Sequence, residues 1–160
     1  MEKAQQIRAF QATVDASIHG LESLVRMLEK EQQALASNNP EFLEQAVKEK
    51  LDVIQELSHS IAARNELQHS LQLPEGLEGG RAFLETFKAP EKVMTVWQKL
   101  TDLSKQVVKL NNMNGQMANE GARSTRQALS ILTGRSADED TYSANPRKRK
   151  GLSSYDLGKA

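Results

Sequence analysis

Apolar residues recur at heptad spacing in the last third of the chain before its tail. Counted from Val93 in steps of seven, the a positions are Val93, Leu100, Val107, Asn114, Gly121 and Ala128. The d positions are Val96, Leu103, Leu110, Met117, Ser124 and Ile131. This unbroken phase predicts one helix over about residues 91–132. Its first half can bury branched side chains, whereas its second half offers mostly Asn, Gly and Ser. The second half is therefore either an open docking surface or a frayed helix end.

Two earlier segments carry similar stripes and predict helices over about residues 3–36 and 40–71. The a positions of the first are all apolar: Ile7, Val14, Leu21, Leu28 and Leu35. Between the two helices, Asn39 is placed to cap the second helix and Pro40 to occupy its first position. A connection this short makes the two helices antiparallel neighbours.

Prolines and glycines at 74, 76, 79 and 80 predict a linker over residues 73–80. Phe83 and Phe87 then suggest a short helix over about 81–88 that covers the end of the bundle, with Trp97 packed against one of these rings. The predicted fold class is all-α: an elongated antiparallel bundle of three long coiled-coil-like helices with a short connecting helix. The bundle should occupy residues 1–134, and residues 135–160, which have little apolar surface to bury, should form a flexible C-terminal tail.

Composition narrows the class of protein. The 160 residues include 21 basic and 21 acidic side chains, so no net field favours nucleic acid or an anionic membrane. Cysteine is absent, which fits a reducing compartment. No apolar run resembles a secretory signal or a membrane span, so we expect a cytoplasmic protein without direct membrane insertion.

Catalytic and metal-binding patterns are weak. Glu56 with His59 and Glu66 with His69 have the i, i+3 spacing of helical di-metal sites, but both pairs fall on one helix, so surface histidines are the better interpretation. No nucleophile motif or phosphate-binding glycine loop is present. We therefore expect neither an enzyme nor a cofactor. The basic run at residues 147–150 is either a solvated tail segment or a partner of an acidic protein surface, and less plausibly a nucleic-acid contact.

The stretch LNNMNGQMANEGARSTRQALSILTGRSADEDTY, residues 110–142, resembles the bacterial flagellar export chaperone family FlgN. The matching elements are an L-N-x-x-N-G core at residues 110–115, Q-A-L at 127–129, and a tyrosine, Tyr142, before a basic tail. A second matching piece is E-K-L at residues 49–51. The family often has Tyr-Gly after the helix, whereas this chain has Tyr142-Ser143.

The resemblance implies a chaperone that holds the hook-filament junction proteins FlgK and FlgL, prevents their premature assembly, and delivers them to the type III export gate through FlhA, with the escort protein FliJ as a further partner. A cargo helix would lie along the second half of the last helix. Candidate cargo-binding residues are Asn111, Asn114, Gly115, Met117, Leu129 and Leu132. Tyr142 is the residue implied in docking on the gate.

Within this set, Asn114 at an a position can fix helix register, and Gly115 lets another backbone approach closely. Leu129 and Leu132 lie off the a/d seam, where they could face a cargo helix. From the residues alone, two other classes stay open: a structural coiled-coil scaffold or tether, and a basic-tailed nucleic-acid accessory protein.

Overall fold

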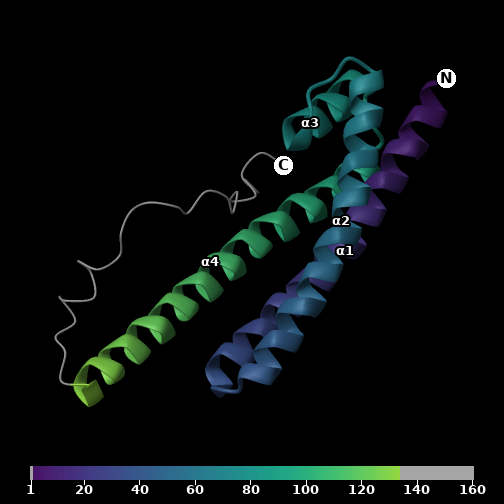
Figure 1. The fold of residues 1–160 in the computed structure, drawn as a ribbon. Helices are drawn as coiled ribbons and strands as arrows, with labels where there is room; N and C mark the ends of the chain where they lie inside the picture. Colours follow the sequence, from purple (N-terminus) through teal and green to yellow (C-terminus); the bar gives the residue numbers. More distant parts are fainter. Residues whose placement is uncertain (1, 134–160) are drawn as a thin grey trace.

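The computed structural model describes residues 2–133 and shows four helices there, with no β-strand in that range (Figure 1). They are α1 (Lys3–Ser37), α2 (Pro40–Ser70), α3 (Gly76–Thr86) and α4 (Glu91–Thr133). The predicted all-α fold with three long helices and a short connecting helix is confirmed. The predicted tail, residues 135–160, lies outside the described residues.

The hairpin of α1 and α2 is set by its turn and by one glycine. Asn38 takes the left-handed conformation that ends α1, with φ 54°. The Asn39 side chain then caps α2 by accepting a hydrogen bond from the Phe42 amide at 3.1 Å. Inside α1, a Cβ on Gly20 would lie 2.9 Å from Leu57 Cδ1, so the glycine allows α2 to approach closely. This contact offsets the low helix propensity of glycine.

The short helix α3 begins at Gly76, five residues earlier than the glycine-rich linker predicted. Its first turn is held by the end of α2, because Gly76 donates its amide to Asn65 Oδ1 at 3.1 Å and its carbonyl accepts from Gln68 Nε2 at 3.2 Å. Gly80 lies directly under the indole, and a Cβ there would be 2.0 Å from Trp97 Cη2. The glycines therefore serve helix packing here and are not linker residues.

Aromatic rings join α1, α3 and α4 at one end of the bundle. Phe10 and Phe83 stack with their centroids 4.1 Å apart, and Phe87 stacks on Phe83 at 4.4 Å. Trp97 was predicted to pack against Phe83 or Phe87, but its closest ring is Phe10, at 5.6 Å. These ring contacts bury large apolar side chains and hold this end of the bundle together.

The long helix α4 lies along α1, whereas the backbones of α2 and α4 hardly approach each other. The pairing with α1 is parallel: Trp97 meets Phe10, Lys99 pairs with Glu22, and Asn114 reaches Leu28. Toward its C-terminal end α4 leaves the α1–α2 hairpin (Figure 1). Two consequences matter for function, namely an open groove between α2 and α4 and a protruding second half of α4.

Candidate partner-binding surfaces

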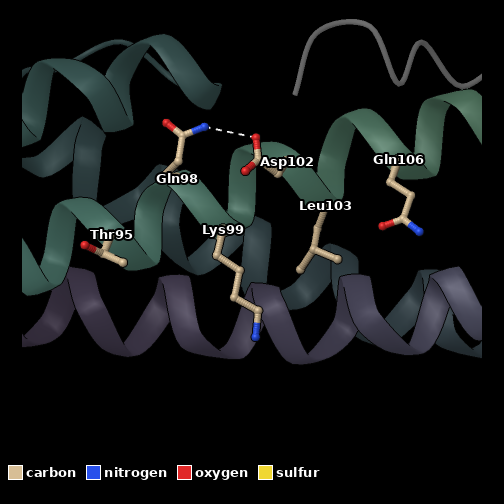
Figure 2. Close-up of a pocket in the computed structure, with 6 residues that line it drawn as sticks. All are labelled: Thr95, Gln98, Lys99, Asp102, Leu103 and Gln106. Atoms are coloured by element: carbon tan, nitrogen blue, oxygen red, sulfur yellow. Dashed lines mark hydrogen bonds between the residues drawn. The ribbon is translucent and has the colours of Figure 1, made fainter.

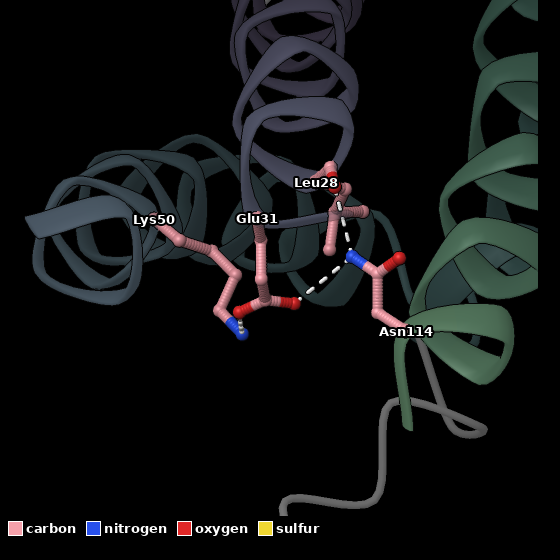
Figure 3. A network of polar contacts seen from close by, with 4 residues as sticks. All are labelled: Leu28, Glu31, Lys50 and Asn114. Carbon is pink, nitrogen blue, oxygen red and sulfur yellow. Dashed lines mark hydrogen bonds and ion pairs between the residues drawn. The ribbon is translucent and has the colours of Figure 1, made fainter. Parts of the chain in front are cut away.

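Asn114 is the last strongly buried residue of α4 whose exposure is described, with 2% of its surface accessible. Its Nδ2 donates to the Leu28 carbonyl at 2.8 Å and to Glu31 Oε1 at 3.0 Å, both on α1 (Figure 3). The other carboxylate oxygen of Glu31 forms an ion pair with Lys50 on α2. A single polar network thus joins all three long helices.

Both hydrogen bonds of the Asn114 side-chain amide are therefore made to α1 of the same chain. A buried amide that finds partners at only one helix position specifies register, because sliding α4 by a turn would leave it unsatisfied. The Oδ1 atom of Asn114 has no hydrogen-bond partner in the part of the chain that the structure describes. The structure therefore gives Asn114 a positioning role at the base of the protruding part of α4.

Beyond Asn114, α4 is open to solvent. Among the predicted cargo-binding residues, Asn111 and Gly115 are exposed and Met117 is half-buried. A Cβ on Gly115 would meet nothing within 4 Å. Ile131 and Leu132 are 82% and 81% exposed, the most exposed large apolar side chains among those described. This helix face offers apolar groups with no partner in the described part of the chain.

The side chains of two other predicted site residues lie outside what the structure describes. Leu129 belongs to α4, but its side chain is outside what the structure describes. Tyr142, the predicted gate-docking residue, lies beyond the described residues altogether.

A second open surface is the groove between α2 and α4, with a volume of about 560 Å³. Leu21 and Leu24 of α1 form part of its lining, Leu57 and Ile61 contribute from α2, and Val107 and Val108 from α4. Asn111 also lines it, so the groove ends close to Asn114, where the protruding part of α4 begins. The sequence did not reveal this groove, because a heptad phase defines the apolar face of α4 but not which helix that face covers.

Arg64 in the α2 wall of this groove is 2% exposed. Its guanidinium carbon lies 5.5 Å from the centre of the Trp97 ring, and its Nε has no hydrogen-bond partner within residues 2–133. Burial lowers the pKa of Arg64, although an arginine keeps its positive charge at neutral pH. A signal for this residue was present in the sequence, because the stripe of Leu57 and Ile61 continues at helical spacing to Arg64.

A third depression, of about 540 Å³, lies on α4 alone and is lined by Thr95, Gln98, Lys99, Asp102, Leu103 and Gln106 (Figure 2). Its charges already have partners: Gln98 Nε2 donates to Asp102 at 3.0 Å, and Lys99 Nζ lies 2.7 Å from Glu22 Oε1 on α1. The Lys99 hydrogen bond and charge hold the pKa of the Glu22 carboxyl below its usual 4.5. Because both charged side chains of this depression are already paired, it is not a candidate site.

A comparison with protein families decides the assignment. The model of the family described as FlgN protein matches residues 1–150. The chain belongs to the FlgN family. Comparisons with curated proteins and with solved structures gave no match. FlgN proteins are chaperones of flagellum assembly, so membership of the family implies a flagellar export chaperone role for this chain.

Neither metal binding nor a membrane span has a basis in the described part of the chain. Residues 2–133 contain no group of three histidine, aspartate or glutamate side chains close enough to hold a metal ion. His59 and His69 lie exposed on α2. None of the helices described is sufficiently long and apolar to cross a bilayer.

Proposed function

We propose that this chain is a cytoplasmic chaperone that binds the junction proteins FlgK and FlgL and delivers them to the flagellar export gate. The observation that carries the proposal is the protruding half of α4, which ends in the exposed Ile131 and Leu132 of a chain that belongs to the FlgN family. An exposed apolar helix face fits a partner that presents an apolar face of its own.

The mechanism is binding and release, and it uses no cofactor and no catalysis. Subunits that assemble through apolar helices expose those helices before assembly and would aggregate. An amphipathic cargo helix lies along Asn111–Leu132, and its apolar face is buried against α4 there. Met113 and Met117 suit this contact, because a flexible thioether adapts to different neighbouring side chains. Asn114 contributes indirectly, because its hydrogen bond to Leu28 holds α4 at a fixed position on α1.

Delivery to the gate is assigned to the C-terminal part of the chain. Tyr142 contacts the gate component FlhA, and the escort protein FliJ is a further partner. A tyrosine suits such an anchor because it buries a large area, freezes few torsions and brings a hydroxyl to a polar rim.

The proposal is tested by purifying the tagged full-length chain from its flagellated host and identifying what comes with it. We expect FlgK, FlgL and FlhA, together with a chain that stays monomeric or dimeric in sedimentation without cargo. Stable higher oligomers that contain none of these partners would instead identify a structural scaffold.

A further inference from the structure

The groove between α2 and α4 contains a buried cation without a counter-charge. Arg64 makes no ion pair and no hydrogen bond within residues 2–133, and its one specific contact is the face of Trp97. Removing an arginine from water without a carboxylate partner is costly, and a ring face compensates only part of that cost. Within residues 2–133, the charge of Arg64 is therefore left without a complementary charge.

The rest of the groove defines what that complement is attached to. Its lining is mostly apolar, and its uncharged polar residues, Thr101, Ser104, Asn111 and Asn112, all come from α4. The only other charged residue in the lining is Lys105, and no aspartate or glutamate is present. A ligand that fits is therefore apolar along most of its length and acidic at one point.

The dimensions suit a helix. Along α4 the lining runs from Leu100 to Asn112, which is about 18 Å or three turns at 1.5 Å per residue. Because the backbones of α2 and α4 stay apart on either side of α1, a fourth helix placed between them would complete a four-helix arrangement. From Asn111 the same helix would continue onto the protruding part of α4.

We propose that this groove binds an amphipathic helix of the exported cargo, and that one aspartate or glutamate on the apolar face of that helix pairs with Arg64. The identity of the partner rests on the proposed function. The charge and shape that the partner must have are inferred from the residues that line the groove. A carboxylate at this position distinguishes the cargo from other apolar helices, since any helix without one would leave Arg64 buried and unpaired.

Occupancy of the groove can be measured with a single label. Because the chain has no cysteine, one introduced cysteine is the only thiol that a label can modify. Ser104 lines the groove, so Ser104→Cys carrying a small trifluoroethyl group gives a fluorine resonance that reports on it. We expect purified FlgK or FlgL to shift this resonance, whereas dilution of the free chain and deletion of residues 135–160 should not. A shift on deletion would identify the chain's own tail as occupant, and a shift on dilution would identify a second copy. Either result would overturn the proposal.

The charge is tested with Arg64→Met, which keeps an unbranched apolar side chain beside Trp97. It should weaken binding of the junction protein at least tenfold, yet leave the melting temperature equal or higher, because an unpaired buried charge has been removed. Arg26→Met, at an exposed arginine outside the groove, should change neither quantity. A carboxylate-to-amide scan of the cargo should find one position whose effect disappears in the Arg64→Met background.

The outcomes separate the two proposals. If the unmodified chain binds neither FlgK nor FlgL, the proposed function fails. If it binds them but the resonance does not shift, or Arg64→Met binds as tightly as the unmodified chain, the groove proposal fails and the chaperone function stands. A fall in melting temperature with unchanged affinity would make Arg64 a structural residue only.

Discussion

The side-chain amide of Asn114 on α4 donates a hydrogen bond to the main-chain carbonyl of Leu28 on α1, at 2.8 Å. This bond marks where α4 changes character. Before it, the a and d side chains of α4 are buried or half-buried. Beyond it, the side chains whose exposure is described are exposed, apart from the half-buried Met117 and Ser130. Asn114 thus separates the part of α4 that packs on α1 from a part whose described side chains are mostly exposed.

Replacing Asn114 by alanine should lower the free energy of unfolding by about 1–3 kcal/mol, because two buried hydrogen bonds are lost and Glu31 loses an amide donor. Urea unfolding followed by circular dichroism measures this. Asn112→Ala, at an exposed neighbour, should stay within about 0.5 kcal/mol of the unmodified chain. Equal effects at both positions would remove the register role of Asn114.

Two glycines should respond in opposite directions to alanine. Gly80→Ala should destabilise the fold by about 1–3 kcal/mol, because the new methyl group overlaps Trp97. Gly115→Ala should stabilise it by about 0.5–1 kcal/mol, since its Cβ meets nothing and alanine favours helix. The fluorescence of Trp97, the only tryptophan, follows both transitions. Destabilisation by Gly115→Ala would show that its surroundings are not open.

The ion pair of Lys99 and Glu22 should give stability that depends on pH. Because the pKa of Glu22 is lowered in the folded chain, its contribution is present above the unfolded pKa of about 4.5 and is lost as pH falls through the folded pKa. Lys99→Met should therefore reduce stability more at pH 7 than at pH 3, and less in high salt. Lys92→Met, at an exposed lysine without an ion pair in the described range, is the control. A reduction independent of pH would mean that Lys99 contributes through packing.

The helices could be predicted from the sequence because their stripes, the Asn39 cap and Pro40 are local signals. The start of α3 could not, because whether Gly79 and Gly80 lie in a linker or under an indole depends on where Trp97 packs. The groove could not be predicted either, since it depends on α4 packing on α1 while its backbone stays apart from that of α2. The position of Asn114 in the stripe suggested a register role, whereas its partners Leu28 and Glu31 required the structure.

The role of Tyr142 in gate docking is a separate prediction, carried by family membership. Tyr142→Ala should weaken binding to the cytosolic domain of FlhA by about 2 kcal/mol or more, while binding of cargo to α4 largely remains. Tyr155→Ala, at the other tyrosine of the chain, is the matched control. Titrating both variants with cargo bound measures the effect, and unchanged affinity for Tyr142→Ala would leave gate docking to other residues.

The central claim, that cargo binds the protruding half of α4, is tested most directly by a matched pair of leucines. Leu132 is 81% exposed at the end of α4, and Leu51 is 57% exposed on α2. Since both side chains are exposed, Leu→Asp at either position should leave the fold intact, and circular dichroism checks this. Calorimetric titration with purified FlgK or FlgL should show at least tenfold weaker binding for Leu132→Asp and unchanged binding for Leu51→Asp. If Leu132→Asp binds as tightly as the unmodified chain, or Leu51→Asp loses binding instead, the cargo surface is not on the protruding half of α4.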